Sequence, residues 1–489
     1  MRACLKIPIG PVFAPRAGWL GARREDTRQR SLTDEQRRQP VLGAKTLRAA
    51  ALLPLAFVGS TLTARCGDAR VSPPRPAPKS LAASPIAMFR QALRSNPIFR
   101  RWIPTHFCRA AILTAAVLCV LMPLPAAEFQ PPLKTTDGFA VPQPGRRFEF
   151  PRDHGSHPEF KIEWWYVTGH LFGESDRRFG FQATFFRRAG PQPSNESAIP
   201  ATSAAFGNVE LHLAHMALLD VPGRRFVHEE RLNRAGWDAG SSAKTLAVHN
   251  GNWFLRLGTN ASGALSLQGS VRGEASFSLA LTPTKPLVVF GENGVSRKGA
   301  APTASSHYLT FPRLAVGGEV TLDGRKQSVR GQAWMDHEIS SSQLDDDQAG
   351  WDWASLQLND GREIMAYRLR KQDGSTDPFS QLAWVDARGA VTNFSSTQFT
   401  WSTVRTWKST VTGGVYPVLV KLATTDPGSG RPVTFTLEPV VLDQELSGAL
   451  GGIPYWEGAC HVLNDKAEKV GSAYLELTGY VGSLAERFK

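Results

Sequence analysis

Short polar turns recur along the chain from residue 128 onward, and they separate short runs of alternating apolar and polar residues. Turns of this kind join antiparallel strands, so each pair of flanking runs predicts a β-hairpin. The clearest turns are Pro222-Gly223, Asn250-Gly251, Asp323-Gly324 and Asp360-Gly361. No long stretch keeps the 3.6-residue apolar period of a helix, and strands do not alternate with helices. The sequence therefore predicts an all-β fold of antiparallel sheet, built as sandwiches or barrels.

A segment rich in proline and glycine interrupts the strand pattern over residues 283–306. We expect it to separate one domain over residues 128–300 from a second over residues 301–489, each the size of one barrel. Regions of this size can bury a core of their own. Cys460 is the one cysteine from residue 128 onward, so no intramolecular disulfide can stabilise this part of the chain.

The basic charge of the chain belongs to its N-terminal leader. The formal net charge is +13, and residues 1–127 hold 20 Lys and Arg against 5 Asp and Glu. From residue 128 onward, 36 basic residues stand against 38 acidic ones. Binding to nucleic acid needs a basic surface that neutralises phosphates, so this balance argues against nucleic acid as a partner.

An uncharged apolar run over residues 110–122 predicts a secretory signal peptide, because arginines precede it and Pro125-Ala126-Ala127 follows it. The run is shorter than the ~20 residues that span a bilayer. We therefore expect residues 88–127 to be a signal peptide and the mature protein to be periplasmic or secreted. A signal anchor retained at the inner membrane is the alternative. Residues 1–87 fit no signal, and we expect them to be disordered or an extension wrongly assigned upstream of a true start at Met88.

Common catalytic motifs are missing from the sequence. It contains no G-x-S-x-G elbow, no P-loop and no G-x-G-x-x-G pattern. His228-Glu229 and His337-Glu338 begin like a zinc-protease motif, but neither has the second His four positions on. We therefore expect neither a serine hydrolase nor a metalloprotease nor a nucleotide enzyme. No histidine spacing is diagnostic of a metal site, and we expect no metal and no cofactor.

Two clusters combine ionisable groups with large aromatic rings. The first runs from residue 150 to residue 170 around Glu163-Trp164-Trp165-Tyr166, and the second is Trp334-Met335-Asp336-His337-Glu338 followed by Gly350-Trp351-Asp352-Trp353. Because side chains alternate along a strand, Trp334 and Asp336 share one face, together with Glu338 if the strand continues. The open alternatives are that the tryptophans are core residues, that the Asp caps a turn, and that His154 and His157 are ordinary loop residues.

The second cluster has a specific chemical logic. A carboxyl group among indole rings is desolvated, which raises its pKa and can keep it protonated near neutral pH. A protonated Asp could give its proton to a carbon–carbon double bond and leave a carbocation. Indole faces would stabilise that cation and exclude stray nucleophiles, and one positioned water would then add.

Both clusters resemble the secreted, lipocalin-like AttH-like family, which also contains the carotenoid 1,2-hydratases, or hydroxyneurosporene synthases. The resemblance extends to His212-Leu213-Ala214-His215-Met216-Ala217 and to Phe179–Arg187, and it covers about residues 135–485. It implies two tandem lipocalin-like antiparallel β-barrel domains. Bacterial members of the family often carry the label of predicted secreted hydrolases.

The resemblance to the hydratases also implies a set of site residues. Asp336 matches the acid, and Trp334 stands where the aromatic residue two positions earlier would be. His307 is the candidate for the upstream His, as the residue that orients the acid or the water. Leu309 replaces the Trp implied two positions after that His, which would remove one wall of the cation site.

Three functions follow from these observations. The first is a hydro-lyase that adds water to a lipophilic, isoprenoid ligand, with Asp336 as acid. The ligand-binding residues would be Trp351, Trp353, Trp164, Trp165 and Tyr166. The second is a non-catalytic periplasmic carrier of an apolar ligand, associated with the membrane surface or with an ABC exporter. The third, a hydrolase, rests on the family label without a nucleophile in the sequence. The sequence leaves the oligomeric state open.

Overall fold

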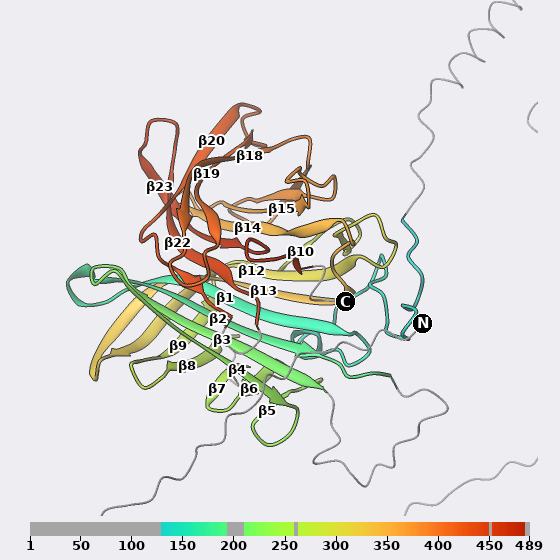
Figure 1. Ribbon diagram of the computed structural model, residues 1–489, viewed down its shortest axis with the longest axis horizontal. Helices are drawn as coiled ribbons and strands as arrows, with labels where there is room; N and C mark the ends of the chain where they lie inside the picture. Colours follow the sequence, from blue (N-terminus) through green and yellow to red (C-terminus); the bar gives the residue numbers. More distant parts are fainter. Residues whose placement is uncertain (1–128, 193–209, 259–262, 449–451, 485–489) are drawn as a thin grey trace, which may run out of the picture. The chain divides into compact units, whose positions relative to one another are not determined.

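The computed structural model describes residues 129–192, 210–258, 263–448 and 452–484, and all of these lie in one compact unit, Ala127–Lys489 (Figure 1). The predicted extension over residues 1–87 and the predicted signal peptide over residues 88–127 lie outside the described residues. In the described part of the chain, no helix has the length and apolar character needed to cross a membrane.

The first antiparallel sheet has 13 strands, in the order β4-β3-β2-β1-β13-β12-β9-β8-β7-β6-β5, with β10 and β11 paired to β12. Its strands are β1 (Ile162–Phe172), β2 (Arg178–Arg188), β3 (Leu211–Asp220), β4 (Arg225–Arg234), β5 (Ala239–Ser241), β6 (Ala247–Asn250), β7 (Trp253–Leu257), β8 (Leu265–Val271), β9 (Ala275–Pro283), β10 (Val288–Phe290), β11 (Ser296–Arg297), β12 (Ser305–Leu322) and β13 (Arg325–Ser342). Two short 3-10 helices, η2 (Arg152–His154) and η3 (Glu174–Asp176), flank β1.

The second antiparallel sheet has 10 strands, in the order β17-β16-β15-β14-β23-β22-β20-β19-β18, with β21 paired to β22. It is drawn in orange to red in Figure 1. Its strands are β14 (Gln348–Leu358), β15 (Glu363–Lys371), β16 (Gln381–Val385), β17 (Val391–Ser395), β18 (Thr400–Lys408), β19 (Val415–Thr425), β20 (Pro432–Pro439), β21 (Glu445–Leu446), β22 (Tyr455–Leu463) and β23 (Lys469–Leu477).

The all-β prediction is confirmed, and the predicted turns join paired strands. Asp323 and Gly324 both have positive φ, at 50° and 76°, as the tight turn between β12 and β13 requires. The chain changes from the first sheet to the second between Ser342 and Gln348. This change lies downstream of the boundary that we expected near residue 300, because β12 and β13 return to pair with β9 and β1.

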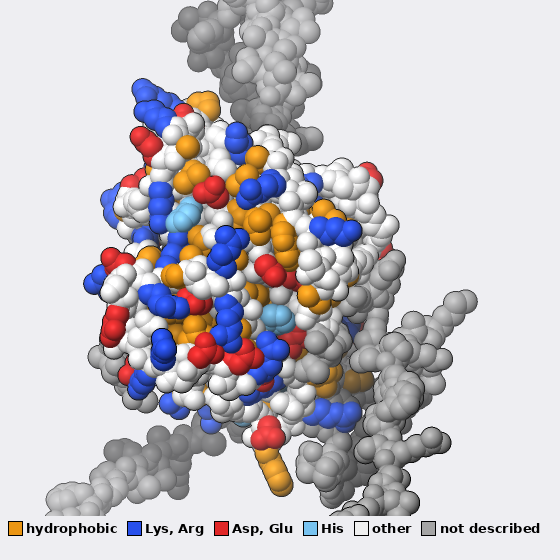
Figure 2. Space-filling view, turned by 60° about the vertical axis from the view of Figure 1, so that its left-hand side comes forward, with side chains coloured by type: hydrophobic (Ala, Val, Ile, Leu, Met, Phe, Trp, Pro, Cys, Tyr) orange, Lys and Arg blue, Asp and Glu red, His pale blue; other side chains and the backbone are white. Residues whose placement is uncertain are grey.

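Strand alternation places the two sides of the first sheet in different environments. On β1 and β13, Trp165, Val167 and Met335 pack into the core of the first sheet. Their neighbours Tyr166 and Trp334 point the other way, into an aromatic cluster shared with residues of the second sheet. The outer surface in Figure 2 carries acidic and basic side chains between small apolar areas, in agreement with the near balance of charge from residue 128 onward.

We predict that Gly331→Ala destabilises the protein. A Cβ at Gly331 would collide with the backbone carbonyl oxygen of His170 on β1, which cannot move without disturbing the ladder. Overpacking of this kind costs about 1–3 kcal/mol, which urea denaturation would measure as a lower free energy of unfolding. Gly317→Ala on β12 is the matched control, because a Cβ there meets nothing within 4 Å. Equal stability of the two variants would contradict this packing.

Candidate active site

A cavity of about 860 Å³, including the part that opens to solvent, lies where the two sheets meet. The first sheet and the segment between β11 and β12 contribute Trp164, Tyr166, Phe186, Lys298, Tyr308, Asp336 and Glu338. The second sheet contributes Trp351, Trp353, Tyr367, Tyr455 and Glu476. The cavity therefore combines a largely aromatic lining with three carboxyl groups and one lysine.

Asp336 is the most closely held of these carboxyl groups. Its Oδ1 accepts hydrogen bonds from Thr310 Oγ1 at 2.6 Å and Trp334 Nε1 at 2.7 Å. Its Oδ2 accepts one from the Tyr308 hydroxyl at 2.7 Å. Burial raises the pKa of Asp336 to about 7, with a further rise from Glu338, although these hydrogen bonds lower it. A large fraction of Asp336 is therefore protonated at neutral pH.

Glu338 lies two residues further along the same face of β13, as alternation predicted. Lys298 Nζ is 3.3 Å from Glu338 Oε2, and the Ser306 hydroxyl donates to the same oxygen. The Lys298 ammonium also lies 4.7 Å and 4.1 Å from the ring centres of Tyr308 and Tyr367. Glu338 therefore has a cationic partner, whereas Asp336 is held by uncharged donors alone.

Aromatic rings from both sheets meet around Asp336. Trp353 of β14 donates a hydrogen bond from Nε1 to the Tyr308 hydroxyl at 2.9 Å. This bond joins the second sheet to the face of the first sheet that lines the cavity. The Trp353 ring meets those of Tyr166 and Trp334 edge to face, at centroid distances of 5.2 Å and 6.1 Å. Of the residues that the sequence analysis assigned to ligand binding, the structure places Trp351, Trp353, Trp164 and Tyr166 in the lining of the cavity.

Two of the predicted site residues lie elsewhere. His307 is on the opposite face of β12 from Tyr308, and its Nδ1 is 2.8 Å from the carbonyl oxygen of Gly294. Burial lowers the pKa of His307 to about 4, so it is neutral near pH 7. The structure does not bring it to Asp336, and Tyr308 takes that position instead. Leu309 shares the face of His307 and packs with Phe160, so it removes no wall of this cavity.

Trp165 is the second of these residues. It is fully buried on the core side of β1, where its Nε1 donates to the His154 carbonyl oxygen at 3.0 Å. Its ring stacks on His337 at a centroid distance of 4.8 Å. Because Trp164 and Trp165 are neighbours on a strand, one of them lines the cavity and the other supports its wall from behind.

Sequence reasoning missed the acid pair on the second sheet. Glu476 of β23 lines the cavity, and Glu457 of β22 lies directly opposite it in the strand pairing. The Tyr166 hydroxyl donates to Glu457 Oε1 at 2.7 Å across the two sheets. The available signal was an acidic residue two positions from a tyrosine in an otherwise apolar strand, Tyr455 before Glu457 and Tyr474 before Glu476.

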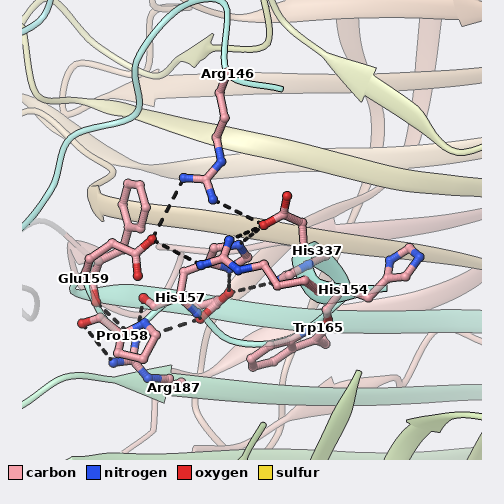
Figure 3. Close-up of polar contacts among 12 residues, drawn as sticks. Arg146, His154, His157, Pro158, Glu159, Trp165, Arg187 and His337 are labelled. Carbon is pink, nitrogen blue, oxygen red and sulfur yellow. Dashed lines mark hydrogen bonds and ion pairs between the residues drawn. The ribbon is translucent and has the colours of Figure 1, made fainter. Parts of the chain in front are cut away.

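A second polar cluster lies behind the cavity, on the core side of β13 (Figure 3). Glu163 Oε1 is 2.8 Å from His157 Nδ1 and 2.9 Å from His337 Nε2. These three groups could hold a metal ion. However, His157 Nε2 also lies 2.9 Å from Asp153 Oδ1, and Arg187 comes within 3.8 Å of Glu163 Oε2.

The contacts around this cluster favour a structural role. Arg146 and Arg152 both pair with Asp153, and Arg187 lies beside Glu163. Burial alone would raise the pKa of Glu163, but the hydrogen bonds from His157 and His337 outweigh it and lower the pKa to about 2. The atoms that could ligate a cation already bond one another, so we assign the cluster to holding β1 against β13.

Comparison with known proteins agrees with this fold. A family model described as AttH-like matches residues 141–480. A crystal structure of an AttH from Nitrosomonas europaea is similar at 37% identity and a TM-score of 0.62, over 70% of this chain and 100% of that one. Kievitone hydratase from Nectria haematococca is similar in fold at 16% identity and a TM-score of 0.52, over 72% of this chain and 98% of that one. No protein of curated function matches the chain. The predicted family resemblance and its lipocalin-like β fold are confirmed.

We predict that Glu163→Gln destabilises the protein by about 3 kcal/mol at pH 7, because it removes one charge from a buried, paired cluster. The pKa of Glu163 is near 4.5 in an unfolded chain and about 2 in the folded protein. The contribution of the Glu163 carboxylate to the free energy of unfolding is therefore complete above pH 4.5 and is lost as the pH falls through 2. Urea denaturation at a series of pH values should show the deficit of the variant shrinking over this window. The exposed Glu174→Gln is the control, and a deficit of the same size at every pH would contradict the assignment.

Proposed function

The chain belongs to the AttH-like family, and from this premise we propose that it adds water to a carbon–carbon double bond of a lipophilic, isoprenoid-type ligand. One observation carries the proposal: Asp336, a buried and largely protonated carboxyl group, faces an aromatic cavity of ligand size. The fold shared with kievitone hydratase agrees with it. The reaction would then be that of a hydro-lyase.

Proton transfer from Asp336 begins the proposed reaction. Thr310 and Trp334 both donate to Oδ1, whereas Oδ2 receives the Tyr308 hydroxyl, so Oδ2 has room for the acid proton. The π electrons of the double bond take this proton and form a new C–H bond, which leaves Asp336 ionised and a carbocation on the more substituted carbon. The three donors that hold Asp336 also stabilise the carboxylate that results.

The surroundings of Asp336 suit the positive charge that develops. The electron-rich faces of Trp353, Trp351 and Tyr166 attract a cation and expose no nucleophile to it. The ionised Glu338 adds a negative charge on the same wall. Water then forms the C–O bond, and its spare proton returns to the Asp336 carboxylate. The acid is regenerated, and the product is heavier than the ligand by one water.

A carrier is the second candidate, and one observation favours it. The hydrogen bonds from Tyr308 and Thr310 to Asp336 link β12 and β13, so this residue also has a structural role that needs no chemistry. A carrier would hold the same apolar ligand in the same cavity and release it unchanged. In either case, the predicted signal peptide leads us to propose that the protein acts in the periplasm or outside the cell, beside a membrane surface or an exporter that supplies the ligand.

We predict that Asp336→Asn removes hydration activity by ~100-fold or more while the ligand still binds, because the amide fills the same space without an acid proton. The full-length protein would be incubated with lycopene and with farnesene, and mass spectrometry would follow bound ligand and a product heavier by one water. The exposed Asp373→Asn is the control and should match the unchanged protein. Retention of unchanged ligand by all three proteins would instead identify a carrier.

We also predict that the rate falls as the pH rises through about 7. The reaction needs the protonated form of Asp336, whose pKa is raised to about 7, so activity is complete below that pH and declines above it. A pH profile of kcat/KM between pH 5 and pH 9 would show the decline as a single step. Thr310→Val removes one donor that stabilises the carboxylate, so it should raise the midpoint. A rate that increases with pH would exclude Asp336 as the acid.

A further inference from the structure

The acid pair of the second sheet, Glu457 and Glu476, has a geometry that the proposed reaction does not use. These two residues are direct partners across β22 and β23, so both side chains point to the same face of the sheet. Glu476 is half-buried and lines the cavity, whereas Glu457 is 1% exposed and lies behind it. Side chains in such positions have their Cβ atoms about 5 Å apart, close enough for one carboxyl group to feel the charge of the other.

Neither member of the pair has a cationic partner in the described part of the chain. Lys298, the lysine of the cavity, is 3.3 Å from Glu338 on the opposite wall. Glu457 receives the Tyr166 hydroxyl on Oε1, and its Oε2 is buried with no hydrogen-bond partner among the described residues. Two adjacent carboxylates with no counter-ion cannot both remain ionised in a low-dielectric site.

The electrostatics agree with this geometry. Burial is the largest cause that raises the pKa of both groups, and the mutual repulsion of the pair raises that of Glu457 further. For Glu476, the charges of Asp336 and Glu338 across the cavity add to the rise. The raised pKa of both groups favours the protonated form, and a protonated carboxyl group is a hydrogen-bond donor.

We propose that the Glu457–Glu476 pair is the recognition site for an uncharged oxygen of the ligand, with the Glu476 carboxyl group donating a hydrogen bond to a carbonyl or hydroxyl group. This inference shares only the cavity with the proposed function, on which it rests, and it specifies the class of ligand. The ligand is an oxygenated, uncharged unsaturated lipid rather than a pure hydrocarbon. Glu457 is a positioning residue, because it lies directly beside Glu476 without reaching the ligand and supplies no positive charge that would favour the ionised form of Glu476.

The two ends of the ligand contact different walls of the cavity. The oxygen lies against the second sheet at Glu476, and the double bond lies against the first sheet at Asp336. Lys298, the lysine of the cavity, is already paired with Glu338, so a ligand carboxylate would be buried without a counter-ion and anionic lipids are rejected. A hydrocarbon would leave the Glu476 hydroxyl without an acceptor, which costs affinity.

Several other titratable groups face the pair, and the experiment takes them into account. These groups are Asp336 and Glu338 of β13, Tyr166 of β1, Tyr308 of β12, Tyr455 of β22, Tyr474 of β23 and Lys298. Burial raises the pKa of each of these tyrosines well above its usual value, so they stay neutral over the range tested. Asp336 does titrate near pH 7, and Asp336→Asn removes that titration from the binding measurement.

The test compares three probes that share one isoprenoid chain: farnesal, an aldehyde; farnesene, a hydrocarbon; and farnesoic acid, a carboxylate. Quenching of tryptophan fluorescence would give a dissociation constant for each with the full-length Asp336→Asn protein. We expect farnesal to bind about tenfold or more tighter than farnesene, which corresponds to about 1.4 kcal/mol, and farnesoic acid to bind most weakly at pH 7. Equal affinity for farnesal and farnesene, or tightest binding of the acid, would overturn the proposal.

The pH dependence and three further changes in the same background make the assignment specific to this pair. Rising pH ionises the pair, so affinity for farnesal should fall while affinity for farnesene stays constant. Glu457→Lys places a cation directly beside Glu476 and should move the midpoint of this fall to lower pH. Glu476→Gln keeps an N–H donor and should bind farnesal with no such fall, whereas Glu476→Leu should lose the preference for the aldehyde. The exposed Glu468→Gln is the control. A midpoint unmoved by Glu457→Lys would contradict the pairing.

The outcomes separate this inference from the proposed function. A preference for the aldehyde that depends on Glu476, with no hydrated product from any probe, would support the ligand class and contradict the hydratase. Hydration of farnesene and farnesal with equal kcat/KM would support the hydratase and contradict the ligand class.

Discussion

Glu163 connects the segment that precedes β1 to strand β13, and the geometry of the cavity depends on that connection. Its Oε1 faces His157 at 2.8 Å and His337 at 2.9 Å, and its Oε2 accepts the backbone N–H of His157 at 2.9 Å. These contacts fix His337 on the core side of β13. Because neighbours on a strand face opposite sides, Asp336 and Glu338 are fixed on the cavity side by the same contacts.

The second sheet supplies the other half of the surroundings of Asp336 on β13. Trp353 reaches across to the Tyr308 hydroxyl, and Tyr166 reaches back to Glu457. Each of these hydrogen bonds satisfies a polar atom that would otherwise be buried alone, and together they limit how far the sheets can separate. The desolvation that keeps Asp336 protonated therefore depends on both sheets, and neither sheet alone would provide it.

The sequence predicted correctly that Trp334, Asp336 and Glu338 share one face of β13. It did not predict which residue of β12 lies beside Asp336. A two-residue turn at Asp323-Gly324 starts the register, and an unbroken ladder from that turn would place His307 on the same face as Asp336. The register shifts by one residue between Phe311 and Leu314, next to Pro312, which has no N–H for the ladder. This bulge turns His307 away from the cavity and brings Tyr308 into it, because a one-residue shift exchanges the faces of a strand. Alternation alone could not reveal it. Glu457 and Glu476 were missed for a different reason, since pairing between β22 and β23 and contact with the first sheet are both long-range facts.

Some buried acidic residues of this protein have a cationic partner and others have none, and this difference bears on function. Away from the cavity, Asp352 pairs with Arg368 and Arg370, and Glu363 pairs with Lys285 and Arg313. Such pairing is the usual way in which a fold tolerates a buried carboxylate. At the cavity, Asp336 and Glu476 lack a cationic partner among the described residues, and burial shifts both toward the neutral acid. A leucine or glutamine would fill either position without this electrostatic cost. Carboxyl groups kept neutral in an aromatic cavity are suited to giving a proton or a hydrogen bond to a ligand, and this chemistry distinguishes the cavity wall from the rest of the core.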